Sequence, residues 1–560
     1  MDDLPTEILE RILSFVPNGR PLEDDKTANP NSNLVHGNIQ GHQENDQRAE
    51  TEGEPVKESG EHQDLESRHT SRTSVSRKRP KVNHKPYKSV KSQNATLTTT
   101  LPKSARRSPR TNLLETLTFR RIILKSTDLA EFSSIVRGNR AAAVVWIKYQ
   151  VVLPSYSRRD YARFETEKDE AANNAAFSEA IHGLFGILKS WEEEAKNNRK
   201  LADDLNIANV ESPTDSGMWL SSKDAEGDKL KPRKYRRIAG ERFAHSYIEL
   251  HNPNDLPEHT CISKFAAESN WRNLAPSAAT SILTKLDGIK EIHLYLSDNE
   301  KKCPQKRRQL RHDFALGLRQ ISLTSLTNFS LNYTYYTPLN HYFSPPTAYH
   351  DSSPSIDLLG EALHLVSLAP NLIRFNLSGH FVISPEVFWP RNLDFNKPLW
   401  SKLKEYHVTY SPCNPNGGWY FTRRPGLTQA DDVTFSREDV SPEDSETESE
   451  LGDSPGQDNR SDQSADEQSD GSTSSTEFTH EIYYPIRERI DRGDIPERGF
   501  RGWPNNEAIM PLMKAVAKAV KFMPVLKSMS LTGAVEDAYN SHKYFGGLTF
   551  KFVANDAESW

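Results

Sequence analysis

The sequence Ala369-Pro-Asn-Leu-Ile-Arg-Phe-Asn-Leu377 places apolar residues in the order apolar-x-x-apolar-x-apolar, and its last part is expected to form a strand. Helical stretches are predicted in front of several copies of this pattern, over 278–286, 356–368 and 507–522. A helix followed by a strand is therefore the expected recurring unit. The pattern recurs at Ile289/Ile292/Leu294, Leu326/Phe329/Leu331, Leu403/Tyr406/Val408 and Leu526/Met529/Leu531.

This recurring unit resembles the leucine-rich repeats of the irregular kind, which contain one strand and one helix. Each unit alone leaves an apolar face uncovered, and stacking of neighbouring units buries it. The resemblance implies an α/β fold in which helix–strand units form an irregular leucine-rich-repeat-like solenoid. This body would span 111–430 and 481–560. The alternative is an ordinary α/β domain with buried strands.

Further elements are expected on both sides of these copies. Strands are predicted over 117–124, 142–153 and 205–210, and a last strand or hairpin over 544–553. A short helix is predicted over 128–136, ended by Gly138, and a long helix over 165–195. The whole body should therefore alternate between helices and strands.

The first seventeen residues have the pattern of an amphipathic helix. Pro5 suits a first helical position, and Glu7 lies in the first turn, where a negative charge meets the positive end of the helix dipole. Apolar residues then form one stripe that needs a partner surface. The stripe consists of Ile8, Leu9, Ile12, Leu13 and Val16.

The order of residues 4–16 resembles the opening helix of an F-box. The resemblance implies that this helix docks on a Skp1-type adaptor and thereby joins a cullin–RING (SCF) ubiquitin ligase. The alternative is a helix that packs on its own domain. The residues expected to bind the partner are Leu4, Pro5, Glu7, Ile8, Leu9, Ile12, Leu13 and Val16.

The body also resembles a family of uncharacterised F-box proteins of filamentous fungi in the order of its segments. This resemblance supports the expectation of an F-box adaptor without naming a target. The residues that carry it are 119–123 (FRRII), 131–137 (EFSSIVR), 144–154, 171–181 (AANNAAFSEAI) and 419–421 (WYF).

Two long segments are expected to be disordered, because hydrophobic residues make up only 35% of the 560-residue chain. The linker 18–110 is acidic at first, and then carries thirteen Lys or Arg and no Asp or Glu over 68–110. The insert 431–480 is acidic. A cationic cluster of the nuclear-localisation type lies in the basic part, and phosphate-mediated nucleic-acid binding is its other interpretation. The cluster is Arg77, Lys78, Arg79 and Lys81.

The sequence offers no enzymatic or metal-binding motif, so neither catalysis nor a cofactor is expected. Cys261, Cys303 and Cys413 are far apart, which argues for a reducing compartment and against disulfides or a zinc site. His245 and His251 are expected to be surface residues on one side of a strand. Residues 414–421 predict a turn before an aromatic strand, with a ligand-facing loop as the alternative.

No run of about 18 apolar residues and no signal peptide occurs, so a soluble protein of the cytoplasm and/or nucleus is expected, without a membrane partner. The preferred function is a substrate-recognition adaptor that binds an unknown protein target. The alternative is a nuclear scaffold that binds nucleic acid or histones through the basic and acidic segments, without a role in a ligase.

Overall fold

The computed structural model describes a body of helices and strands that forms one unit. The expected helix 1–17, the linker 18–110 with its basic cluster at 77–81, and most of the insert 431–480 lie outside the described residues. The described residues are 116–157, 160, 164–194, 202–215, 242–268, 272–390, 399–434, 492–494, 498–536 and 544–553.

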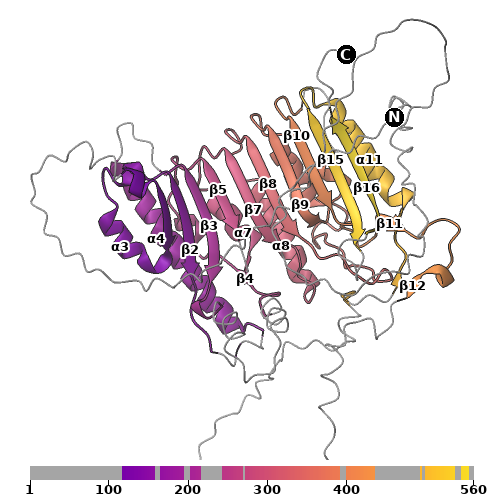
Figure 1. Ribbon diagram of the computed structural model, residues 1–560, viewed down its shortest axis with the longest axis horizontal. Helices are drawn as coiled ribbons and strands as arrows, with labels where there is room; N and C mark the ends of the chain where they lie inside the picture. Colours follow the sequence, from indigo (N-terminus) through magenta and orange to yellow (C-terminus); the bar gives the residue numbers. More distant parts are fainter. Residues whose placement is uncertain are drawn as a thin grey trace, which may run out of the picture. The chain divides into compact units, whose positions relative to one another are not determined.

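A ten-stranded sheet runs through the body, and its strands lie side by side in the order β1-β2-β3-β5-β7-β8-β9-β10-β15-β16 (Figure 1). Every neighbouring pair is parallel except β15 and β16, which are antiparallel. The bounds are β1 Arg121–Lys125, β2 Trp146–Val152, β3 Asp204–Glu211, β5 Lys264–Glu268, β7 Glu291–Ser297, β8 Asn328–Thr334, β9 Arg374–Phe381, β10 Glu405–Tyr410, β15 Ser528–Glu536 and β16 Tyr544–Val553. The expectation of a mixed α/β fold is thus confirmed.

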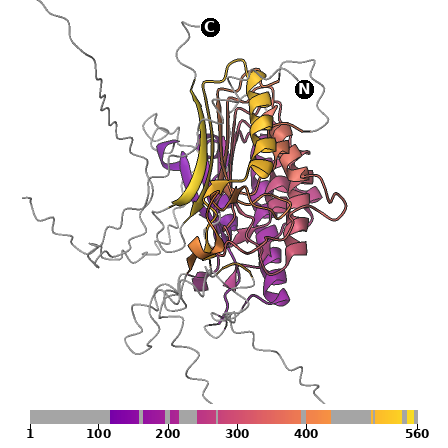
Figure 2. The same cartoon turned by 90° about the vertical axis from the view of Figure 1, so that its right-hand side faces the viewer.

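The helices that connect the strands lie together on one face of this sheet (Figure 2). Crossovers between parallel strands are right-handed, so strands that follow one another in chain order place their helices on the same side. None of the described helices is long and apolar enough to span a bilayer. The helices on this face are α4 Glu167–Glu194, α7 Pro276–Leu283, α8 Pro304–Leu318, α9 Leu358–Ser367 and α11 Asn506–Lys521.

The five copies of the apolar pattern meet in register beneath the helices. In the middle copy, Phe375 is fully buried, and its ring lies 5.5 Å from that of Phe329 and 4.9 Å from that of Tyr406 (centroid distances). Two continuous apolar rows therefore cross the sheet and form much of the core. The first row is Ile292, Phe329, Phe375, Tyr406 and Met529, and the second is Leu294, Leu331, Leu377, Val408 and Leu531.

Most predicted elements are present, but the first strand was placed too early. Residues 116–119 are helical, and β1 begins only at Arg121. The neighbouring strand β2 begins at Trp146, which is the partner of Arg121, while Ala141–Ala143 form a 3-10 turn. Residues before 121 consequently have no strand beside them with which to pair.

Candidate functional site

The face of the sheet opposite the helices carries a row of polar side chains from neighbouring strands. The Nδ2 of Asn376 donates a hydrogen bond to the Oγ of Ser330 at 3.2 Å, and the Nδ1 of His407 lies 2.8 Å from the Oγ of Ser530. Side chains on one face of a parallel sheet align across the strands, so this row is continuous. Apart from Ala266, which lies between the first two, its members are polar: Asn206, His293, Ser330, Asn376, His407, Ser530 and Lys551.

A second row on the same face, one step closer to the amino ends of the strands, is charged. Lys264 pairs with Glu291 at 3.0 Å, and Arg374 pairs with Glu405 at 3.0 Å. Exposed pairs of this kind contribute about 0–1 kcal/mol, so they add little to the stability of the fold. Their alternating signs instead suit the polar surface of a protein partner. The row is Asp204, Lys264, Glu291, Asn328, Arg374, Glu405 and Ser528.

A β-bulge in β9 marks the carboxyl end of this face. Leu377 pairs with Val408 and Phe381 with Tyr410, so β9 has two more residues than β10 between these pairs. Gly379 there has a φ of 90°, and an added Cβ would lie 2.5 Å from the Oδ1 of Asn332. The bulge returns Phe381 to the buried side, where it is 0% exposed.

A buried ionic network lies where the strands β7 and β8 end. Asp298, directly after β7, accepts hydrogen bonds from the Nε and Nη2 of Arg307 and from the Nη1 of Arg311, at 3.0, 2.8 and 2.7 Å. Arg311 also pairs with Asp357 at 3.6 Å. Burial favours the neutral acid, but the two guanidinium groups outweigh it and hold the pKa of Asp298 below its usual value. The network joins α8 to the loop before α9.

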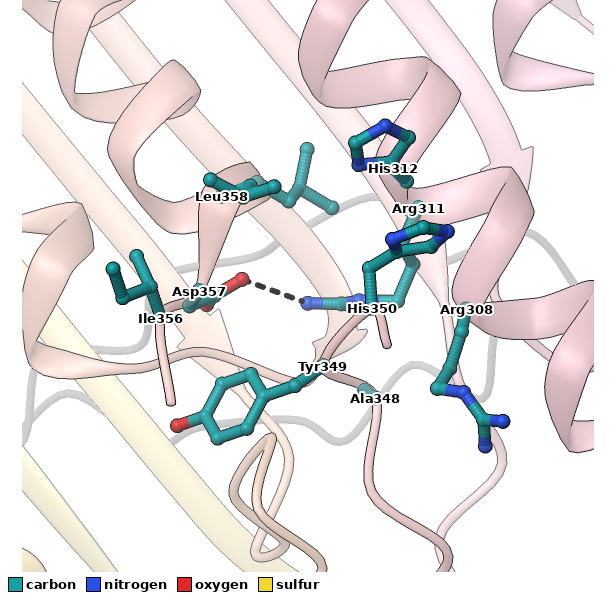
Figure 3. Close-up of a pocket in the computed structure, with 10 residues that line it drawn as sticks. Arg308, Arg311, His312, Ala348, Tyr349, His350, Ile356, Asp357 and Leu358 are labelled. Atoms are coloured by element: carbon teal, nitrogen blue, oxygen red, sulfur yellow. Dashed lines mark ion pairs between the residues drawn. The ribbon is translucent and has the colours of Figure 1, made fainter. Parts of the chain in front are cut away.

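A small cavity adjoins this network between α8, the loop 348–350 and the start of α9 (Figure 3). The rings of His312 and His350 stack above it at a centroid distance of 4.1 Å, and Arg311 points across it toward Asp357. Its volume of about 10 Å³ matches a single water molecule. This cavity is therefore too small to bind an organic ligand.

A larger pocket of about 300 Å³ opens beside it and reaches the lower end of the size range of ligand sites. Tyr335 and Phe343 supply aromatic walls, and four basic side chains also belong to the lining. Glu300 lies in the wall, and its buried Oε2 has no hydrogen-bond partner among the described residues. The pocket can therefore hold a side chain with an apolar body and a polar tip. The lining is Glu300, Lys301, Lys302, Pro304, Arg307, Tyr335, Phe343, Pro346, Thr347 and Arg492.

Loops from distant parts of the chain hold the wall of this pocket in place. The Nε1 of Trp419 donates to the carbonyl of Phe343 at 2.9 Å, and the guanidinium of Arg501 lies 4.7 Å from the Trp419 ring centroid. The Nδ1 of His341 accepts from the backbone N–H groups of Phe500 and Arg501 at 2.7 and 2.8 Å. Burial and the nearby Arg501 charge lower the pKa of His341 to about 4, so the ring stays neutral.

The histidines singled out in the sequence do not form a site together. The Nδ1 of His245 lies 2.9 Å from the Oε1 of Glu300, and its side chain is largely buried, so the expectation of a surface residue was wrong for it. His251 is exposed, as expected, but β4 covers only Tyr247–Ile248 and includes neither histidine. The predicted turn over 414–421 is confirmed, because Cys413 pairs with Trp419 across it.

The F-box-like residues Leu4 to Val16 and the cluster from Arg77 to Lys81 lie outside the described residues, so their expected roles remain predictions. Sequence reasoning missed the buried pair Arg307 and Arg311. The sequence signal for their burial was the spacing of four residues, which places them on the same side of α8 as the buried Phe314.

Comparison with known proteins finds no matching family model, curated protein or solved structure.

Proposed function

We propose that this protein is a non-enzymatic substrate-recognition adaptor of a cullin–RING ubiquitin ligase, acting in the cytoplasm and/or nucleus. The segment 4–16 would dock on a Skp1-type adaptor, and the body would hold a protein target. The observation that carries the binding role of the body is the face of the ten-stranded sheet opposite the connecting helices, with its two polar rows. The F-box resemblance of the N-terminal segment supports the link to the ligase.

We also infer that the body is an irregular leucine-rich-repeat-like solenoid. Two features support this inference: the strand order follows the chain order, and the five apolar triplets align across β7, β8, β9, β10 and β15. In such an arrangement each helix–strand unit contacts mainly its neighbours, and the strands present one extended binding face.

The target would lie across the two polar rows, and the larger pocket, beyond the carboxyl ends of β7 and β8, would be a separate contact for one of its side chains. The rows offer Lys264 and Arg374 beside Glu291 and Glu405, so they suit a polar partner surface of mixed charge. The aromatic walls of the pocket favour a side chain with an apolar body and a polar tip. Ubiquitin transfer by the ligase would be promoted by proximity, because holding the target near the ligase raises the effective concentration of the target's lysines.

The link to the ligase is tested with the full-length protein and a Skp1-type adaptor in a pull-down. Ile12→Asp places an unpaired charge on the apolar stripe and is expected to abolish binding. Arg11→Asp is the matched control, because it introduces the same side chain on the opposite side of the predicted helix, and it should retain binding. An Ile12→Asp variant that binds like the wild type, or a wild-type protein that does not bind, rejects the proposal.

The target surface is tested by proximity labelling in the native cell. The double variant Lys264→Glu, Arg374→Glu reverses two charges on the face opposite the helices and is expected to lose the labelled target. Lys514→Glu, on the exposed side of α11, is the matched control and should retain it. Loss with Lys514→Glu alone would assign target binding to the helical face and overturn the proposal.

A further inference from the structure

Three side chains that are typical metal ligands meet beside the end of α4. Glu192 lies in the last turn of this helix, and His259 and Cys261 lie in the segment that leads into β5. Their ligand atoms all lie within 4.8 Å of one another. Imidazole, thiolate and carboxylate together form a donor set that suits zinc and its substitute cobalt.

The spacing of two of these atoms matches a tetrahedral site. The Nδ1 of His259 lies 3.2 Å from the Oε2 of Glu192. Zinc bonds to nitrogen and oxygen measure about 2.0–2.2 Å, so neighbouring ligands in a tetrahedron are roughly 3.3–3.5 Å apart. An ion between these two atoms therefore requires only a small movement. The sulfur of Cys261 needs to approach by no more than about 1–1.5 Å, which its side-chain torsion can supply.

The surroundings hold the ligands in place. The Oε1 of Glu192 accepts from the backbone N–H groups of Thr260 and Cys261 at 2.8 and 3.0 Å, which leaves Oε2 on the side of His259. His259 is fully buried, and its ring meets that of Phe185 edge-on at 5.0 Å. Hydrogen bonds to a ligand carboxylate orient it for the metal. Glu192 and Cys261 are only half buried, so one side of the group is open to solvent.

Two contacts of the metal-free group compete with an ion. The same Oε2 and Nδ1 atoms can share a hydrogen bond, which clamps the two segments without an ion. The Nζ of Lys189 also lies 3.7 Å from the Glu192 carboxylate, and its charge opposes that of a cation. The Lys189 side chain is 41% exposed, however, so solvent screens its charge, and its Nζ also donates to the carbonyl of Glu258 at 3.0 Å. The Cys261 thiol is also hydrogen-bonded to the Glu192 carboxylate, so all three side chains of the group meet at this carboxylate.

We propose that Glu192, His259 and Cys261 bind a divalent cation of the zinc type, with water as the fourth ligand. On binding, the Cys261 thiol releases its proton to solvent, and the neutral His259 ring donates the lone pair of Nδ1. The ion joins the end of α4 to the segment before β5. This proposal is independent of the ligase function.

The test uses the full-length protein after removal of metals with a chelator. Cobalt is added, and the thiolate-to-cobalt charge-transfer absorption is recorded; zinc affinity is measured by competition with a chromogenic chelator. Cys261→Ser keeps a hydroxyl donor beside Glu192, and Glu192→Gln keeps an oxygen for the backbone N–H groups. Each variant can thus retain the metal-free clamp while its metal ligand is weakened. Cys303→Ser is the matched control, because Cys303 is exposed and lies outside the group.

The wild type and Cys303→Ser are expected to show the absorption and to gain thermal stability from zinc. Cys261→Ser should lose the absorption, and both ligand variants should bind zinc at least about 100-fold more weakly. Circular dichroism of the metal-free proteins checks that the variants are folded. The proposal is overturned if the wild type lacks the absorption, if Cys261→Ser retains it, or if zinc stabilises Cys261→Ser as much as the wild type.

Discussion

Asp298 and Arg307 form a bidentate ion pair inside the protein. The Nε and Nη2 of the guanidinium lie 3.0 and 2.8 Å from the two carboxylate oxygens. The Asp298 side chain is only 1% exposed. Because Arg307 also lines the larger pocket, the pair ties the carboxyl end of β7 to a wall of the candidate site. The stability of the body and the shape of the pocket thus depend on the same charges.

Removing the charge of Asp298 should destabilise the body strongly. In Asp298→Asn, the buried positive charges of Arg307 and Arg311 lose the negative charge that neutralises them. Breaking a buried ion pair costs about 3–5 kcal/mol. Asp351→Asn is the control, because Asp351 pairs with Arg308 at 3.2 Å but is 76% exposed, and its loss should cost less than about 1 kcal/mol. Urea denaturation measures both free energies of unfolding. Equal losses in the two variants would contradict the assigned role of the buried network.

Two adjacent residues of β9 should differ sharply in their effect on stability. Phe375→Ala removes a ring packed between Phe329 and Tyr406 and should cost about 3–5 kcal/mol. Asn376→Ala, on the face opposite the helices, loses one hydrogen bond to Ser330 and should cost about 1 kcal/mol or less. Urea denaturation gives both values. A large loss in Asn376→Ala would show that this face is covered in the folded protein.

The strands of the sheet could be predicted because their signal is local. Residues 291–297 alternate between buried and outward positions. The spacing of a triplet such as Leu372, Phe375 and Leu377 predicts by itself that its members are buried. In sheets covered on both faces, parallel strands are almost continuously apolar. The alternation in β7 is therefore also a sequence signal that one face of the sheet is polar.

The contacts around the pocket could not be predicted, because they join residues that are distant in the sequence. The basic segment 301–311 resembles a solvated surface run, and only the fold brings Arg311 to Asp357 and His245 to Glu300. The group of Glu192, His259 and Cys261 was missed for the same reason, since 67 residues separate the first two. Pair spacing along the chain carries no information about such contacts.

Two glycines should respond in opposite ways to an added methyl group. In Gly533→Ala, the new Cβ would lie 2.1 Å from the Cζ of Tyr410, whose ring is fully buried and cannot move freely. Overpacking of this kind costs about 1–3 kcal/mol. Gly186 lies within α4 with no atom near the added Cβ, so Gly186→Ala should stabilise the protein by about 0.5–1 kcal/mol. Thermal melts compare the variants, and a stabilised Gly533→Ala would contradict the packing of β15 on Tyr410.

The body should lose stability in acid. Burial and the charge of Arg501 lower the pKa of His341 from 6.5 to about 4. The unfolded chain therefore binds more protons between these values, and stability should fall as the pH falls from about 6.5 toward 4. At about pH 5, His341 alone should account for a loss of about 2 kcal/mol. His364, whose pKa burial also lowers to about 4, should add a similar loss.

The test compares free energies of unfolding at about pH 7.5 and about pH 5 by urea denaturation. His341→Asn places an amide oxygen near the position of Nδ1, where it can accept from Phe500 and Arg501 without titrating. The variant is expected to be less stable at both pH values, because the ring contacts with Trp419 and Phe500 are lost. The difference between its free energies of unfolding at the two pH values, however, should be about 2 kcal/mol smaller than in the wild type. His293→Asn, with a side chain 43% exposed on the face opposite the helices, should keep the wild-type difference. If His341→Asn also keeps it, the buried ring is not the source of the acid sensitivity, and the loops around the pocket are held together by other contacts.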